Sequence, residues 1–201
     1  LNRRIDEAVE IRLMSDVPLG VFLSGGIDSA AITYYAQKNS AQKIKTFSIG
    51  FDDPSFDESK YANLAAKFLG TEHHSAKFGT RELLDALPRI TELLDEPLAD
   101  GSLLPTYLLS KWTREHVTVA LGGDGGDELF AGYPTFQAHK LAGIYNRAPL
   151  PAKKLFERAV SLLPTSYNNI SFDFKLKKFL ADTESEICHR NQIWLGAFAP
   201  D

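Results

Sequence analysis

Cysteine is almost absent from the 201-residue sequence, in which Cys188 is the single one. An internal disulfide is therefore impossible, and a cysteine-rich zinc site is excluded. Long apolar runs are also lacking, because no stretch approaches the ~18 residues of a membrane span. Residues 1–14 are charged throughout and have no apolar signal-peptide core. We therefore expect a cytoplasmic protein with no membrane partner.

The sequence also lacks a strong excess of charge of either sign. Its 22 basic and 26 acidic residues give a net charge of −4, which offers no broad attraction to nucleic acid. We expect no nucleic-acid partner, and any phosphate must be bound locally. Hydrophobic residues make up 44% and charged residues 24%, which is ordinary for a globular protein and excludes disorder, collagen and coiled coil.

Short apolar runs rich in β-branched residues alternate with stretches of helical period along the first two thirds of the chain. This alternation is typical of an α/β fold with a parallel sheet. In the helix that ends at Gly70, the apolar stripe consists of Tyr61, Leu64, Ala65 and Phe68. The pattern predicts strands at residues 17–23, 44–51, 72–78 and 117–121, and helices at 5–13, 28–37, 57–70, 80–94 and 104–115.

The pattern becomes helical and basic from Phe136 onward, with no convincing strand. We therefore expect an α/β core at residues 1–135 and a helical extension at 136–201. The sequence begins with Leu1 in place of Met, and the extension resembles the start of a helical subdomain that the chain does not finish. We expect a piece of a larger protein.

A first glycine cluster lies between the first predicted strand and the helix that follows. Ligands of open parallel sheets bind beyond the carboxyl ends of the strands. Glycines there allow close approach, and a helix start offers unpaired N–H groups to phosphate. Neither a Walker A loop nor a dinucleotide fingerprint is present. The pattern predicts a phosphate-binding loop, with a plain capped turn as the alternative, at Ser24, Gly25, Gly26, Asp28 and Ser29.

A second glycine cluster, LGGDGGDELFAGYP, follows the last predicted strand at residues 121–134. Asp124, Asp127 and Glu128 crowd together there, which is unfavourable unless a cation or another positive group lies nearby. A metal or ligand role is therefore favoured. An acidic helix N-terminus stabilised by the helix dipole stays open as the alternative.

Two histidines, His73 and His74, are adjacent in the third predicted strand. Neighbouring side chains of a strand point to opposite faces of the sheet, so the two imidazoles cannot easily share a metal ion. We expect them at the surface.

The two glycine clusters together carry a family resemblance. LSGGIDSA resembles S-G-G-x-D-S, the pyrophosphate-binding loop of the N-type ATP pyrophosphatases, the PP-loop superfamily. The stretch from Ile11 to Tyr133 resembles the synthetase domain of glutamine-dependent asparagine synthetases, through TFSIGF, FDES, LGTEHH, DEPLAD, LPTYLLS and VTVALGGDGGDELFAGYP in that order. The resemblance implies a Rossmann-like three-layer parallel sheet, adenine nucleotide alpha-hydrolase-like, with a partial helical extension.

The resemblance also implies roles for single residues. Asp28 and Asp127 would hold Mg²⁺, and Asp124, where many family members have Glu, would serve the acyl-transfer step or the ammonia site. These three aspartates are the expected catalytic residues. Pyrophosphate would be held by Ser24, Gly25, Gly26, Asp28 and Ser29, and the rest of the nucleotide by Leu23, Ile49, Gly122 and Gly123.

The implied reaction is a ligase step of asparagine biosynthesis that uses ATP and Mg²⁺. The β-carboxylate of aspartate is adenylated with release of pyrophosphate, and ammonia then converts the adenylate into asparagine. The family's glutaminase domain, which begins with a nucleophilic Cys, is missing here, so we expect a truncated synthetase domain that is not complete on its own. A homodimer is a further expectation. The alternatives are another adenylating amidotransferase, a β-lactam-synthetase-like ligase of the same fold, and a nucleotide-binding module without catalysis.

Overall fold

The computed structural model describes residues 1–96, 98, 100–166 and 171–196. The chain divides into two compact units, Leu1–Asp124 (unit 1) and Gly125–Asp201 (unit 2), so the division comes before residue 135, where the sequence suggested the end of the core. Within the described residues, no helix has the length and apolar character needed to cross a membrane.

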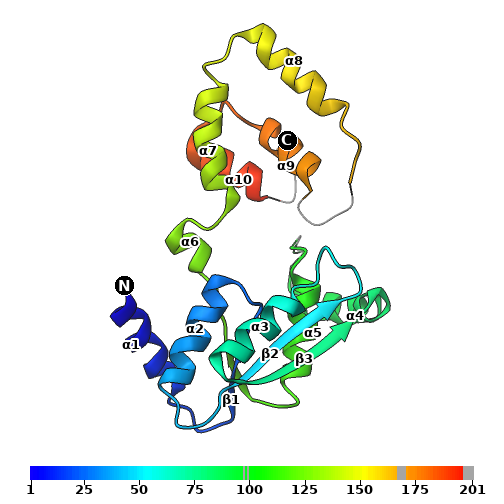
Figure 1. Cartoon of the computed structure of the whole chain (residues 1–201). Helices are drawn as coiled ribbons and strands as arrows, with labels where there is room; N and C mark the ends of the chain where they lie inside the picture. The colour runs from blue at the N-terminus through cyan, green and yellow to red at the C-terminus, as the bar shows by residue number, and fades with distance from the viewer. Residues whose placement is uncertain (97, 99, 167–170, 197–201) are drawn as a thin grey trace. The chain divides into compact units, whose positions relative to one another are not determined.

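A four-stranded sheet in the order β3-β2-β1-β4 forms the centre of unit 1. Figure 1 shows β2 and β3 side by side in this sheet. Every neighbouring pair is parallel, which confirms the predicted sheet. The chain runs from β1 to β2 and β3 on one side, whereas β4 pairs on the other, so the topology switches between β1 and β4. Ligands of open α/β sheets bind at such a switch point. The strands are β1 (Leu19–Phe22), β2 (Lys45–Phe51), β3 (Glu72–Phe78) and β4 (Val119–Leu121).

Helices cover both faces of this sheet (Figure 1). Val21 of β1 packs with Val9 and Ala36 from the first two helices, whereas the Phe47 ring of β2 lies 5.7 Å from the Trp112 ring of the fifth. The expected three-layer arrangement is therefore confirmed. The helices of unit 1 are α1 (Asn2–Leu13), α2 (Ile27–Lys38), α3 (Ser59–Leu69), α4 (Thr80–Leu93) and α5 (Leu103–Thr113).

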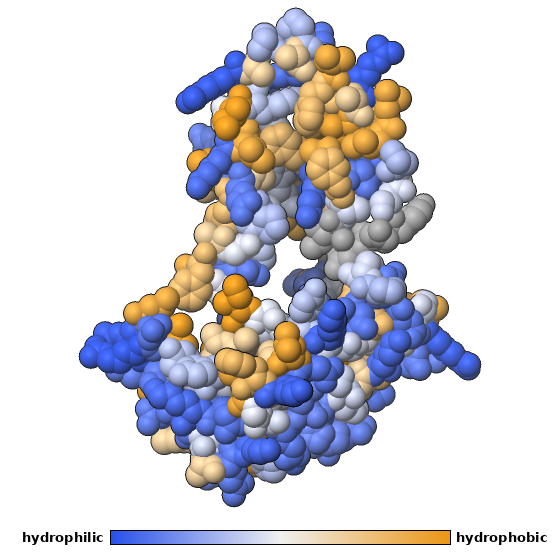
Figure 2. Space-filling model, in the orientation of Figure 1, coloured by the Kyte–Doolittle hydropathy of each residue, from blue (hydrophilic) through white to orange (hydrophobic). Residues whose placement is uncertain are grey.

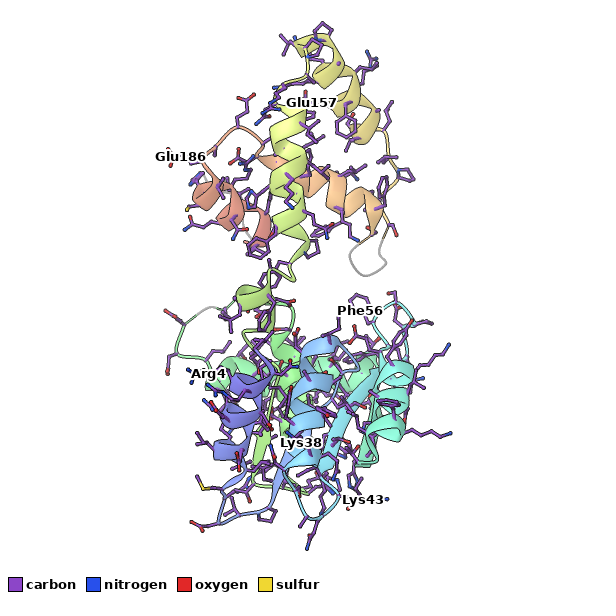
Figure 3. The ribbon with its side chains drawn as sticks, turned by 60° about the vertical axis from the view of Figure 1, so that its left-hand side comes forward. Arg4, Lys38, Lys43, Phe56, Glu157 and Glu186 are labelled. Atoms are coloured by element: carbon purple, nitrogen blue, oxygen red, sulfur yellow. The ribbon has the colours of Figure 1, made fainter. Side chains whose placement is uncertain are left out.

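The two N-terminal helices are held together by an apolar cluster and by one ion pair. Lys38 on α2, labelled in Figure 3, donates to Asp6 Oδ2 of α1 at 2.5 Å. This bond lowers the pKa of the Asp6 carboxyl and raises the pKa of the Lys38 ammonium. Because Lys38 is exposed and Asp6 is only partly buried, water screens the pair, which adds little stability. The apolar cluster that joins α1 and α2 to the sheet dominates the packing.

Helix α3 turns its small residues, not its large ones, toward the protein. Tyr61, Leu64 and Phe68 are exposed by 61%, 68% and 87%, whereas Ala62 and Ala66 are buried. The large apolar stripe seen in the sequence therefore faces solvent, and Figure 2 shows apolar side chains in the region of α3. The start of α3 lies against the glycine loop after β1, because a Cβ at Gly25 would lie 2.6 Å from the Ala62 nitrogen.

The two adjacent histidines point to opposite faces, as predicted, but their expected surface position is wrong. His73 is half-buried, and its ring nitrogens bond Thr46 Oγ1 at 2.9 Å and Ser48 Oγ at 3.2 Å. His74 stacks on Phe47 with ring centroids 5.2 Å apart. The hydroxyl groups of β2 satisfy the His73 imidazole, which allows its partial burial.

Stability should fall on mild acidification because of His73. Burial, and secondly the nearby His74, lowers the pKa of the His73 imidazole below 6.5. As the pH falls, the unfolded state therefore binds a proton at this imidazole before the folded state does. The contribution of neutral His73 to the free energy of unfolding is complete above about pH 6.5 and is lost as the pH falls through the folded-state pKa. Urea unfolding between pH 7.5 and 5 should show a flatter pH dependence for His73→Gln than for the wild type. Identical slopes would refute this role.

The described part of unit 2 is helical and contains no strand, as the sequence predicts. Trp194 is buried at its centre, with the Phe179 ring 5.6 Å away and the His139 ring 4.8 Å away. The Arg190 guanidinium lies over the same indole at 5.4 Å. Unit 2 thus has a small core of its own, to which the seventh, ninth and tenth helices contribute these rings. The helices of unit 2 are α6 (Gly126–Phe130), α7 (Pro134–Tyr145), α8 (Leu150–Ser161), α9 (Phe172–Ala181) and α10 (Ile187–Leu195).

Candidate nucleotide site

The first glycine cluster forms the turn between β1 and α2. The N–H of Leu23 donates to the Phe47 carbonyl at 2.8 Å, and the Leu23 side chain is buried, so the start of the loop is fixed to the sheet. Gly25 has φ +88°, a left-handed conformation that favours glycine. A Cβ at Gly25 would lie 2.5 Å from the carbonyl carbon of Tyr61 and 2.6 Å from the nitrogen of Ala62. The fold itself therefore requires glycine at this position.

Gly26 is not required by the fold. Its φ of −70° and ψ of 164° are open to any residue. A Cβ there would meet nothing nearer than Ser24 Oγ, at 3.4 Å. Gly26 is exposed and directly precedes the first turn of α2. A glycine without a structural reason at a helix start leaves room for an anion to approach the backbone N–H groups.

The second glycine cluster reaches the same edge of the sheet. Gly122 and Gly123 follow β4, the neighbour of β1. A Cβ at Gly123 would lie 2.8 Å from the Ser29 nitrogen and 3.0 Å from the Asp28 carbonyl carbon. The space that a Cβ would fill at Gly122 is occupied by the Asp124 carboxylate. The structure thus brings two segments about a hundred residues apart together at the switch point.

Ile49 lies near the carboxyl end of β2, the other neighbour of β1, and is half-buried. Most of the residues that the sequence predicted for the site therefore lie at one edge of the sheet in unit 1. These residues are Leu23, Ser24, Gly25, Gly26, Asp28, Ser29, Ile49, Gly122, Gly123 and Asp124.

Alanine at position 123 should displace the first turn of α2. The added methyl meets backbone atoms of Asp28 and Ser29, which cannot rotate aside as a side chain would. We expect the affinity for pyrophosphate to fall about 10- to 100-fold, because small misplacements of binding groups have effects of this size. The measurement is calorimetric titration, with Gly101→Ala as control because a Cβ there meets nothing within 4 Å. Unchanged affinity in Gly123→Ala would contradict the arrangement.

Asp127 and Glu128 belong to α6 in unit 2, so the predicted pairing of Asp127 with Asp28 stays a prediction. The Asp127 side chain fills the space that a Cβ would need at Gly132. The Tyr133 hydroxyl donates to Glu128 Oε1 at 2.6 Å. This bond lowers the pKa of the Glu128 carboxyl and raises the pKa of Tyr133 to about 12.

Among the described residues, no group of three or more His, Cys, Asp or Glu side chains is placed to hold a metal ion. Mg²⁺ at nucleotide sites needs only one or two carboxylates, since phosphate and water oxygens complete its shell. Asp28 in the first turn of α2 fits that requirement. In the DEPLAD motif, Asp100 accepts a bond from the Ser102 N–H at 2.8 Å, while Pro97 and Ala99 lie outside the described residues.

The sequence did not reveal that the first turn of α3 supports the glycine loop. Tyr61 and Ala62 perform this role through their backbone, which no side-chain pattern reports. The FDES motif is the available signal, because Asp57 accepts a bond from the Ser59 N–H at 3.0 Å and so fixes where α3 begins. That bond also lowers the pKa of the Asp57 carboxyl.

Comparison with known proteins identifies the family of this chain. The family model described as "Asparagine synthase" matches residues 1–184. The chain is 39% identical over 160 residues to asparagine synthetase (glutamine-hydrolyzing) 1 of Bacillus subtilis, covering 80% of this chain and 25% of that protein. Over 130 residues it is 42% identical to a putative asparagine synthetase (glutamine-hydrolyzing) 2 of Methanocaldococcus jannaschii, covering 64% and 25%.

A solved structure of NMN synthetase from Francisella tularensis is similar at 14% identity and a TM-score of 0.48, covering 96% of this chain and 92% of that one. That resemblance is too distant to add to what the sheet topology shows. The chain spans about a quarter of the length of the curated relatives named above. The match of the family model to residues 1–184 places the chain in the asparagine synthase family.

Proposed function

We propose that this chain is the ATP-handling part of an asparagine synthetase. The β-carboxylate of aspartate attacks the α-phosphorus of ATP, the bond to the pyrophosphate oxygen breaks, and β-aspartyl-AMP forms. Ammonia then attacks the β-carbonyl carbon, AMP leaves, and asparagine is produced with loss of a proton. The relatives are named glutamine-hydrolyzing, and in this proposal glutamine hydrolysis supplies the ammonia.

One observation carries this proposal: the close approach of Gly123 to the backbone of Asp28 and Ser29. It joins the two glycine clusters at the switch point, where an open parallel sheet binds its ligand. A nucleotide bound there would meet the first turn of α2 with its phosphates and would lie beside Gly122 and Gly123. Since the Leu23 side chain is buried, this residue would face the nucleotide through its backbone.

The protein's contribution is mainly electrostatic. Negative charge accumulates on the departing pyrophosphate, and the free N–H groups at the start of α2 offer a fixed positive potential for it. No side-chain nucleophile is needed, because the substrate carboxylate attacks directly. Asp124, beside Gly122, would serve the acyl-transfer step or the ammonia site.

Asp28 would bind Mg²⁺, and Asp127 is the second carboxylate that the family resemblance implies for this ion. When bound, Mg²⁺ supplies charge neutralisation between the phosphates and the carboxylate. Without such an ion, a carboxylate beside phosphates would repel them.

The test is ATP–pyrophosphate exchange by the full-length protein with a panel of amino acids. We expect aspartate to stimulate the exchange and glutamate, asparagine and alanine to leave it at background. Stimulation by a different carboxylic acid would identify another adenylating ligase of this fold. Nucleotide binding without exchange for any acid would identify a module without catalysis.

A further inference from the structure

Two serine hydroxyls close the glycine loop into a ring of hydrogen bonds. The N–H of Gly26 donates to Ser24 Oγ at 3.2 Å, and Ser24 Oγ lies 3.0 Å from Ser29 Oγ. Ser29 Oγ donates to the Gly26 carbonyl at 3.2 Å. It also accepts a bond from the Ser24 N–H at 3.3 Å. The ring therefore begins and ends on Gly26.

The direction of each bond in the ring follows from counting protons. A hydroxyl has one proton and two lone pairs. The proton of Ser29 goes to the Gly26 carbonyl, so the proton between the two serines comes from Ser24. The two lone pairs of Ser29 then accept from the Ser24 N–H and the Ser24 hydroxyl. Ser29 Oγ has no free donor or acceptor left.

The two serines also differ in exposure. Ser29 is 8% exposed and its hydroxyl points into the loop, whereas Ser24 is exposed. A phosphate oxygen can reach the Ser24 hydroxyl from the solvent, where it would accept the proton that Ser24 donates to Ser29 in the free loop. To reach Ser29 it would have to break bonds that shape the loop, leaving buried polar groups unpaired at a cost.

We propose that Ser29 is a positioning residue, which shapes the loop through Ser24 and Gly26 and does not touch the phosphate. Ser24 is the hydroxyl that meets the ligand. In the free loop, Ser24 Oγ accepts the hydrogen bond from the Gly26 N–H, and in the complex a phosphate oxygen accepts it instead. This assignment rests on the proposed function for the identity of the ligand, since it divides the roles of two residues within that site.

A double-mutant cycle on pyrophosphate affinity tests the assignment in this chain. If Ser29 acts through Ser24, the double variant Ser24→Ala/Ser29→Ala should bind pyrophosphate no more than about twofold more weakly than the weaker-binding single variant. The reason is that the effects of two coupled residues on the binding free energy do not add. Losses that multiply would mean that both serines bind phosphate independently, which would overturn the proposal. Thr46→Val is the control, because it removes another buried hydroxyl, which bonds His73 away from the loop. It should lower stability and leave the pyrophosphate affinity unchanged.

A second measurement needs no ligand. Amide hydrogen exchange at Gly26, followed by NMR in the free chain, should accelerate in both Ser24→Ala and Ser29→Ala and stay unchanged in Thr46→Val. Unchanged exchange in Ser29→Ala would refute the ring. If the wild type binds neither ATP nor pyrophosphate, the proposed function fails, while the exchange rates still decide whether Ser29 shapes the loop.

Discussion

Replacing Gly25 by alanine is expected to destabilise unit 1 severely, whereas the same change at Gly26 leaves it folded. Gly25 has a φ of +88°, and its Cβ would collide with the backbone of α3. The left-handed conformation alone costs an alanine about 1–3 kcal/mol, and the collision adds to that. Gly26 has neither problem. Urea unfolding of both variants measures the difference in the free energy of unfolding.

Gly70 provides the matched control for this prediction. It also has a positive φ, +72°, but a Cβ there meets nothing within 4 Å. Gly70→Ala therefore reports the cost of the backbone conformation without the collision. Gly25→Ala should lose clearly more stability than Gly70→Ala. Equal losses would mean that α3 does not press on the loop. Gly26→Ala should keep its stability and lose pyrophosphate affinity, as expected where a glycine serves the ligand.

Asp28→Asn should abolish ATP–pyrophosphate exchange in the full-length protein. The amide has the size of the carboxylate and keeps an oxygen, but it carries no charge to hold Mg²⁺ against the phosphates. We expect a loss of about 100-fold or more, the size seen when one group that stabilises developing charge is removed. Exchange of radiolabelled pyrophosphate into ATP, in the presence of aspartate, measures it.

Two controls keep this result specific. Asp85→Asn removes another helical aspartate, one that forms an exposed ion pair with Arg81, and should exchange as the wild type does. Asp127→Asn tests the second predicted carboxylate separately, since Asp127 belongs to unit 2. Wild-type exchange in Asp28→Asn would remove this residue from the reaction. A loss in Asp28→Asn but not in Asp127→Asn would leave Asp28 as the single protein carboxylate of the magnesium site.

Much of the fold could be predicted because its strands are short, apolar and separated by clear helical patterns. The third strand has the predicted bounds, Glu72–Phe78, and Gly70 ends α3 in the left-handed conformation that favours glycine. The orientation of α3 could not be predicted in the same way. Its inner face is decided by the space that the loop at Gly25 leaves, and a helical apolar pattern does not report such a tertiary contact.

The composition of the candidate site was predictable, whereas the division of roles within it was not. Two glycine clusters, each directly after a predicted strand, indicate a ligand edge from sequence alone. The motif treats Gly25 and Gly26 alike, and likewise Ser24 and Ser29. The structure distinguishes the members of each pair, because backbone angles, neighbouring atoms and hydrogen-bond partners depend on the folded conformation.

The most direct test of the site is the change in amide NMR shifts when pyrophosphate with Mg²⁺ is titrated into the ¹⁵N-labelled chain. Within unit 1, the largest changes should fall on residues 24–29 and 122–124, with Gly26 among the strongest, and should disappear in Asp28→Asn. Shifts centred elsewhere in unit 1, or none at millimolar pyrophosphate, would contradict the assignment of this sheet edge as the nucleotide site.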